Sequence, residues 1–432
     1  MIRATTLTAA ALLGLTLLAP ATSSAAAAAT CQGVPATIVG SATQPELRGT
    51  DGPDVIVTND SALVLALGGD DLICVTGANW AARIDAGDGD DTVDATGAGS
   101  RSATVLGAGA DLYTGSAFDD SVVAGTGTTP SVDTHADVID TAAGYDDVIT
   151  SGEPGTANPD RLRMNRGTLD WRGIPTAGGL LDGGSFSRLI LALDAPGRAV
   201  LDNRAGTLTR EGAPTLAFTG FTQFTIGTAD GSGPFQFVGS DLSEGLYLTA
   251  WRFLEHRADM FGGSDRVFVT SDSVLPDETS YDGGAGARDV LGLTLRQEDV
   301  DLDLRRGTLT TGWGDERRTT PAHGFESASV AAQRVDLVGT ARPNSLQVDA
   351  CRARVEGLAG SDRIATFRQP AGTALSCPSR RVTFIGGAGH DAMRGTTGPD
   401  RLLGGAGRDT AQGRQGRDVC EAEKRQGCEV RR

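Results

Sequence analysis

The sequence predicts an all-β fold, a right-handed parallel β-solenoid of the β-roll or β-helix kind, in which short strands and glycine turns wind into stacked coils. Three observations predict it. Nine-residue units recur at the C-terminal end, glycine accounts for 60 of the 432 residues, and the apolar runs between glycines are short and rich in Val, Ile, Leu, Phe and Thr. Such runs bounded by glycine are typical of strands.

The clearest repeat consists of four consecutive nine-residue units from Gly386 to Glu421. They read GGAGHDAMR, GTTGPDRLL, GGAGRDTAQ and GRQGRDVCE. Glycine at the first and fourth positions allows the backbone to turn tightly. The last three residues of each unit form a short strand, in which the residue at the eighth position of the unit points inward. The aspartates at the sixth position are Asp391, Asp400, Asp409 and Asp418. Two units make one coil, so we expect Asp391 to pair with the Asp409 turn and Asp400 with the Asp418 turn.

Stacked turns of this kind bring carboxylates and backbone carbonyls together. Calcium prefers six to eight oxygen ligands in a tolerant geometry, so the spacing predicts Ca²⁺ between the turns. The stretch resembles the RTX (hemolysin-type) calcium-binding repeat, whose pattern is G-G-x-G-x-D-x-U-x. The resemblance implies a β-roll that orders when calcium binds, with calcium ions as its partners.

Residues 30–151 carry degenerate copies of the same unit, such as GTDGPDVIV at 49–57 and AGDGDDTVD at 86–94. The sixth-position aspartates predicted to bind metal here are Asp54, Asp71, Asp91, Asp111 and Asp120. The first four are spaced by nearly one coil and predict a ladder on one edge. Weaker copies place Asp137 and Asp147 at the same position. The opposite edge has Leu63 and Ala82 near the expected positions, so we expect metal on one edge only.

The N-terminal residues 1–29 read as a secretory signal peptide. A positive residue, Arg3, precedes an apolar run from Leu7 to Leu18 and an Ala/Ser tract with candidate cleavage sites. The alternative is an uncleaved membrane anchor. No later segment is apolar enough to span a bilayer, so we expect a secreted, extracellular protein without membrane insertion once the signal is removed, with the cell surface as one location.

Six cysteines in a secreted chain predict disulfides, although six cysteines allow 15 connectivities. Their clustering in the sequence favours three local pairs. These are Cys31 with Cys74, Cys351 with Cys377, and Cys420 with Cys428. A zinc site is the competing interpretation, but no C-x-x-C or Cys/His cluster is present.

The middle of the chain contains a longer repeat. DGGSFSR at 182–188 matches DGGAGAR at 282–288, and later matches follow in the same order, including AGTLT with RGTLT and GGSDRV with AGSDRI. These matches predict two solenoid modules, 182–281 and 282–384, after a truncated module or connector at 152–181. Residues 385–432 form the repeat block and a disulfide cap. The segment 246–260 is the only expected helix.

The sequence lacks the motifs of common enzyme classes. The single lysine, Lys424, excludes a phosphate-binding loop, and none of the four histidines forms H-E-x-x-H. A net charge of −17 disfavours nucleic acid. We therefore expect a non-enzymatic calcium-binding protein with an adhesive or cell-surface role. An enzyme acting on an extracellular polysaccharide, or a carbohydrate-binding rod, is the alternative, and a glycan or protein partner stays open. The tryptophans that would stack on sugars are Trp80, Trp171, Trp251 and Trp313.

Overall fold

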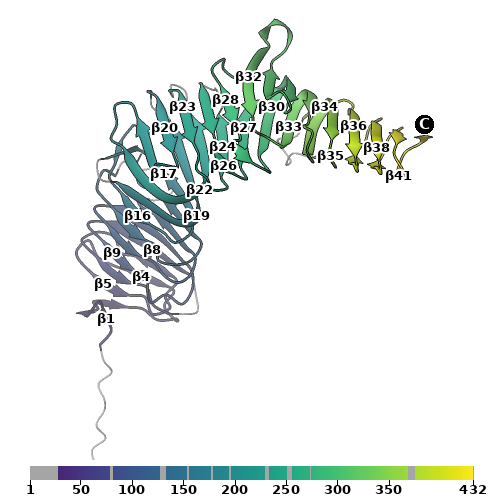
Figure 1. The fold of residues 1–432 in the computed structure, drawn as a ribbon. Helices are drawn as coiled ribbons and strands as arrows, with labels where there is room; N and C mark the ends of the chain where they lie inside the picture. Colours follow the sequence, from purple (N-terminus) through teal and green to yellow (C-terminus); the bar gives the residue numbers. More distant parts are fainter. Residues whose placement is uncertain are drawn as a thin grey trace, which may run out of the picture.

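The fold is all-β, as the sequence predicts. The computed structural model describes residues 28–431 except 78–80, 127–132, 153–154, 177–178, 194–195, 229–232, 251–254, 273 and 368–374. Within these residues the only helical element is a 3₁₀ turn, Gly314–Glu316. Nearly all strands belong to one continuous sheet system whose coils stack along the chain (Figure 1).

The N-terminal coils form two parallel ladders. In each ladder a strand pairs with the equivalent strand of the next coil, so consecutive strands alternate between ladders. The first ladder contains β3 (Ile38–Val39), β5 (Val55–Val57), β7 (Leu72–Cys74), β9 (Thr92–Asp94), β11 (Leu112–Thr114), β13 (Val138–Asp140) and β16 (Arg161–Arg163). The second contains β4 (Glu46–Arg48), β6 (Leu63–Leu65), β8 (Ala82–Asp88), β10 (Ser102–Ala108), β12 (Asp120–Val123), β14 (Asp146–Ile149) and β17 (Gly167–Trp171).

Both ladders meet in the long strand β19 (Leu180–Leu193), which pairs with β16 and β17. From there one ladder runs through β22 (Leu216–Thr228), β24 (Gly245–Ala250), β27 (Arg266–Ser271), β30 (Val290–Asp303), β33 (Ser327–Val338) and β34 (Ser345–Ala359). Beside it run β20 (Ala199–Asp202), β23 (Phe235–Val238), β25 (His256–Asp259), β28 (Ser280–Asp282) and β32 (Arg318–His323).

Two ladders separate again after β34 and continue to the C-terminus. One contains β35 (Arg363–Thr366), β37 (Ala392–Arg394), β39 (Thr410–Gln412) and β41 (Lys424–Gln426). The other contains β36 (Arg381–Gly389), β38 (Arg401–Gly407), β40 (Val419–Glu421) and β42 (Val430–Arg431). This winding is that of a parallel solenoid, and its right-handed sense stays a prediction, favoured by the handedness of parallel crossovers.

A single apolar core runs through the interior of the stack. The central residue of most three-residue strands points inward and lies in register with its neighbours, as Ile56, Ile73, Val93 and Tyr113 do along the first ladder. All four are fully buried, and the core cluster extends from Leu47 to Cys420. Because each coil contacts only its neighbours, stability accumulates from coil to coil.

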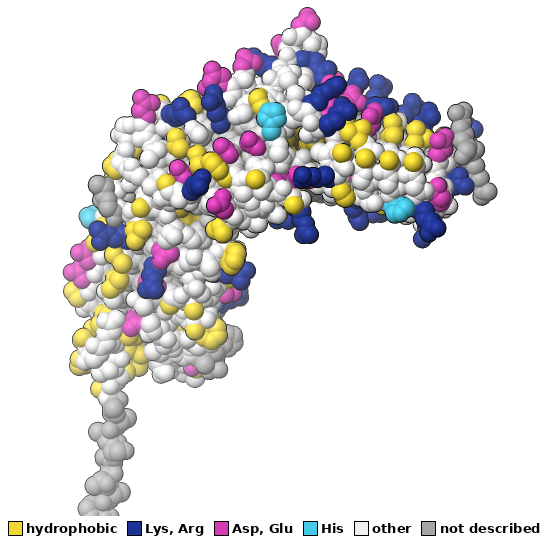
Figure 2. All heavy atoms as spheres, in the orientation of Figure 1, with side chains coloured by type: hydrophobic (Ala, Val, Ile, Leu, Met, Phe, Trp, Pro, Cys, Tyr) yellow, Lys and Arg dark blue, Asp and Glu magenta, His cyan; other side chains and the backbone are white. Residues whose placement is uncertain are grey.

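The stack changes direction between its N-terminal and C-terminal coils, near β19 and β22 (Figure 1). The hairpin of β31 (Thr308–Thr311) and β32 projects from the stack. The matched sequences AGTLT and RGTLT have the same structure, because β21 (Thr207–Arg210) and β31 each pair antiparallel with the preceding strand. Figure 2 shows basic side chains gathered over the C-terminal half.

The expected helix at 246–260 is wrong. Strands β24 and β25 occupy residues 245–250 and 256–259, and the remaining residues of the segment include 251–254, which are not described. Leu246 and Leu248 are buried while Tyr247 points outward and stacks on Phe268 of the next coil, at 5.2 Å between ring centroids. This alternation has the period of a strand.

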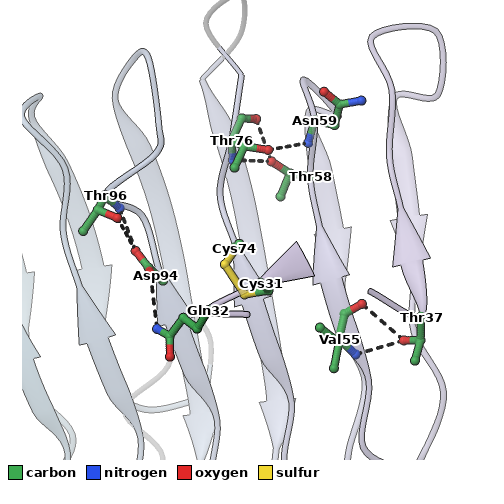
Figure 3. The surroundings of a disulfide bond; sticks show 10 residues. All are labelled: Cys31, Gln32, Thr37, Val55, Thr58, Asn59, Cys74, Thr76, Asp94 and Thr96. Carbon is green, nitrogen blue, oxygen red and sulfur yellow. Dashed lines mark hydrogen bonds between the residues drawn. A yellow bond between two sulfur atoms is a disulfide. The ribbon is translucent and has the colours of Figure 1, made fainter. Parts of the chain in front are cut away.

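The three predicted disulfides are confirmed. Cys31–Cys74 joins the first described segment to β7 (Figure 3). The predicted signal peptide lies outside the described residues up to residue 27, and no helix among the described residues is long and apolar enough to cross a membrane. Trp171 is buried and Trp313 is 57% exposed, whereas Trp80 and Trp251 lie outside the described residues.

Candidate functional site

Buried aspartates form a row along one edge of the N-terminal coils. In each step the backbone N–H of one aspartate donates to Oδ1 of the aspartate one coil later. The distances are 2.7 Å from Asp54 to Asp71 and 2.8 Å for both Asp71 to Asp91 and Asp91 to Asp111. The row continues through Asp137 and Asp160. The predicted ladder is confirmed, and it is two coils longer than the four residues assigned to it.

The C-terminal aspartates pair as the nonapeptide spacing predicts. The N–H of Asp391 donates to Asp409 Oδ1 at 2.9 Å, and the N–H of Asp400 donates to Asp418 Oδ1 at 2.8 Å. Each row ends on a glutamate, because Asp409 donates to Glu423 Oε2 and Asp418 to Glu429 Oε2.

The second edge of the N-terminal block lacks aspartates only in its first coils. Ala82 lies in register with Ser102, and Ser102 with Asp120. The Asp120 N–H then donates to Asp146 Oδ1 at 3.0 Å. Asp146 is fully buried, whereas Asp147, the residue assigned from the sequence, is exposed. Aspartates therefore line parts of both edges in this block.

Three further buried aspartates were missed by the sequence interpretation. Asp265 and Asp289 form a row in the middle of the chain, and Asp362 extends the C-terminal row by donating its N–H to Asp391 Oδ1 at 2.8 Å. The matched motifs GGSDRV and AGSDRI contain Asp265 and Asp362. The Gly-Ser-Asp sequence that both motifs contain is the signal that could have identified Asp265 and Asp362 as turn residues.

The row aspartates fall into two groups, according to whether their second carboxylate oxygen, Oδ2, accepts a hydrogen bond. In the open group Oδ2 is buried and has no hydrogen-bond partner in the described structure, which leaves a charged oxygen unsatisfied. The open group comprises Asp71, Asp91, Asp111, Asp137, Asp265, Asp289, Asp362, Asp391, Asp409 and Asp418. A buried polar group without a partner costs on the order of 1–3 kcal/mol, and more when it is charged.

In the closed group the protein donates hydrogen bonds to Oδ2. Asp146 accepts from Thr141 and Asp160 from Ser151, and the other three members have a hydroxyl residue four positions before the aspartate. Thr50 donates its N–H and hydroxyl to Asp54 Oδ2 at 2.8 and 2.9 Å. Thr396 does the same for Asp400, and the Ser116 N–H donates to Asp120 Oδ2 at 2.8 Å. The protein itself therefore satisfies both oxygens of these three predicted ligands.

Most open turns have a residue with positive φ at the position of this hydroxyl, the exceptions being the turns of Asp137 and Asp289. Gly387 and Gly405 have φ of 113° and 102°. The glycine one position earlier is needed for a different reason. A Cβ at Gly386 or Gly404 would lie 2.3 Å from Oδ2 of Asp391 or Asp409. The nonapeptide glycines thus shape a turn around the open oxygen.

Burial and mutual repulsion disfavour ionisation of several open carboxylates. Burial raises the pKa of Asp91 to about 7, assisted by the neighbouring carboxylates Asp111 and Asp71. Burial likewise raises the pKa of Asp265 to about 7 and that of Asp362 to about 6. In contrast, burial acts to raise the pKa of Asp54, but hydrogen bonds from Thr50 and Thr37 outweigh it and lower the pKa. For Asp91 and Asp265, a neighbouring cation would therefore favour the ionised form near neutral pH.

The donor set fits calcium. The open oxygens are hard carboxylate ligands beside turns rich in backbone carbonyls, which calcium accepts together. No group of three or more His, Cys, Asp or Glu side chains converges in the described residues. Each site would therefore combine carboxylates of two stacked turns with carbonyl oxygens.

Residues 385–420 match the RTX calcium-binding nonapeptide repeat, in four copies. This part of the chain consists of RTX-type repeats. No curated protein matches it. The RTX match covers the rows of Asp391 and Asp400, whereas the N-terminal and middle rows, with the same hydrogen-bond pattern, lie outside it. The RTX repeats support calcium binding by this chain.

Proposed function

We propose that this RTX-type protein is a secreted, non-enzymatic calcium-binding protein, in which Ca²⁺ bridges adjacent coils through the open carboxylate oxygens and so stabilises the solenoid. The observation that carries the proposal is the set of ten buried Oδ2 atoms without a partner, aligned in rows. Among the residues predicted from the sequence, the ligands are Asp71, Asp91, Asp111, Asp391, Asp409 and Asp418. Asp54, Asp120 and Asp400 serve as structural carboxylates.

Calcium would couple folding to binding. Without it, the open carboxylates either repel one another or hold protons, and both states weaken the contact between coils. A bound divalent cation neutralises two stacked carboxylates, so its binding free energy adds to the stability of the coils. The extracellular space supplies calcium, and RTX repeat proteins are typically secreted, which supports the proposed location.

The test compares the mature chain in Ca²⁺ with the same chain in excess chelator, by circular dichroism and thermal melting. We expect more β-structure and a higher Tm in Ca²⁺. Mg²⁺ at the same concentration is the control, because it requires a near-ideal octahedral site and should stabilise less. Identical spectra and melting in Ca²⁺ and chelator would contradict the proposal.

A groove on the C-terminal coils favours an anionic glycan as a second ligand. It encloses about 660 Å³ and is lined by Arg334, Arg352, Arg354, Arg380 and Arg381. Arg334 lies in register with Arg352, and Arg352 with Arg381, so the guanidinium groups stand in a column along the stack. Such spacing suits a repeating polyanion.

Three of these arginines form ion pairs, with Asp336, Glu356 and Asp349. Arg352 and Arg381 are the better probes of glycan binding. We expect glycan arrays to show binding to acidic rather than neutral glycans, and Arg352→Glu with Arg381→Glu to abolish it. Cleavage of a bound glycan would instead support the alternative of a polysaccharide-acting enzyme.

A further inference from the structure

Asp265 and Asp289 lie on consecutive coils in the middle of the chain, outside the residues that match the RTX repeat. Both side chains are fully buried. The Asp265 N–H donates to Asp289 Oδ1 at 2.7 Å, the same link that joins Asp391 to Asp409. Oδ2 of both residues has no hydrogen-bond partner. Two ionisable oxygens are thus aligned in adjacent turns with nothing to satisfy them.

The turns that precede these aspartates stack on each other. β26 (Gly262–Gly263) pairs in parallel with β29 (Ala285–Gly286). Gly263 has a φ of 126°. A Cβ at Gly286 would lie 2.2 Å from Asp289 Oδ2. This close approach reproduces that of Gly386 to Asp391 in the RTX block, although the spacing of glycine and aspartate differs.

A glutamate whose carboxylate has partners stands at each end of this row. On one side Glu244 donates its N–H to Asp265 Oδ1 at 2.7 Å, and its own carboxylate accepts hydrogen bonds from Ser240 and Asn203. On the other side Glu326 accepts the Asp289 N–H at 3.0 Å and pairs with Arg342 at 3.5 Å. The unsatisfied oxygens of this row therefore belong to Asp265 and Asp289 alone.

We propose that Asp265 and Asp289 bind one Ca²⁺ between these two turns, with backbone carbonyls as the remaining ligands. The inference rests on the proposed function for the type of metal, but it assigns a site that the nonapeptide pattern does not predict. The pattern fails here because the turns are shortened or altered, while the stacked geometry and the open oxygens are kept.

The test is the calcium content of the mature full-length chain at saturation. We expect Asp289→Asn and Asp265→Asn each to bind one Ca²⁺ fewer per chain than the wild type. Glu244→Gln is the matched control, because Glu244 is buried in the same row but is satisfied by Ser240 and Asn203. We expect it to leave the calcium content unchanged.

Hydrogen exchange of the wild-type protein tests the site without a substitution. Calcium should slow exchange of residues 261–265 and 284–289 at least tenfold. Unchanged exchange there, or an unchanged calcium content in both variants while Asp409→Asn loses calcium, would overturn this inference and leave the proposed function standing. A wild-type chain that binds no calcium would overturn both.

Discussion

Two neighbouring aspartates of the RTX block should respond differently to the same substitution. Asp391 and Asp400 are both buried, to 2% and 3% exposure, and stand at the sixth position of consecutive repeats. Asp391 Oδ1 accepts the Asp362 N–H at 2.8 Å and its Oδ2 is open. Asp400 has donors on both oxygens, from Val382 on one side and Thr396 on the other.

Asparagine at position 391 keeps the bond from Asp362 through its carbonyl and places a neutral amide where the open oxygen was. Without calcium we expect local stability to stay within about 1 kcal/mol of the wild type, since no hydrogen bond is lost. With calcium at 100 times its Kd, one site contributes about 2.7 kcal/mol. Asp391→Asn should remove about that amount, and calcium-induced protection from exchange should fall about 100-fold.

Asparagine at position 400 directs its amide group at an N–H in either orientation. A hydrogen bond to a charged group is worth about 1.5–3 kcal/mol. We therefore expect a loss of about 2–3 kcal/mol both with calcium and with chelator. The Asp400→Asn variant is the control for Asp391→Asn, because the two changes are chemically identical and lie in adjacent turns.

Hydrogen exchange of residues 386–421 is the suitable assay, because coils of a solenoid open locally. A calcium-dependent loss in Asp400→Asn alone would show that the hydroxyl-closed turn binds metal. An equal loss in Asp391→Asn with and without calcium would show that its carboxylate is structural. Either result would refute the division into open and closed aspartates.

Three more predictions concern pH, a disulfide and a glycine. The pKa of Asp91 is raised to about 7, against roughly 3.9 in the unfolded chain. In the presence of chelator, its contribution to the free energy of unfolding is therefore greatest below pH ~4 and is lost as the pH rises through about 7. Calcium affinity should rise over the same range, and hydrogen exchange of residues 86–94 at several pH values would check both effects. Replacing Cys420 and Cys428 by alanine should lower the free energy of unfolding by about 2.6 kcal/mol, from the chain entropy of so short a loop. The loss would be measured as faster hydrogen exchange of residues 419–431, and unchanged exchange there would contradict the prediction. Gly404→Ala should lower calcium affinity more than tenfold in a titration, because the new Cβ would lie 2.3 Å from Asp409 Oδ2 and would push that oxygen out of place. An unchanged affinity would exclude that oxygen as a ligand.

The sequence predicted best what depends on short, regular spacing. The pairs Asp391 with Asp409 and Asp400 with Asp418 follow from two nine-residue units per coil, and they are confirmed. The three disulfides are confirmed for a related reason, since each closes a loop between nearby coils or within the cap. The calcium ligands themselves stay a prediction.

The same regular spacing does not hold where the coils vary in length. The step from Asp120 to Asp146 is 26 residues, longer than a two-repeat coil. With no fixed spacing, the choice between Asp146 and Asp147 depends on which face of β14 is inside. Val148 is buried, so Asp146 lies on the inward side and Asp147 on the outward side. A shift of one residue reverses the two faces of a strand.

Donors in the preceding turn determine how the second carboxylate oxygen is satisfied. Thr50, Ser116 and Thr396 donate hydrogen bonds to it, whereas the turn at Gly387 leaves Oδ2 of Asp391 without a partner. The first aspartate turn, at Asp54, is closed in this way, and the next residue, Val55, packs against the cluster that contains Cys31 and Cys74. The N-terminal end is thus held by covalent and hydrogen bonds, whereas the proposed calcium sites lie in the interior rows. Chelation should therefore loosen the interior of the solenoid before its N-terminal end.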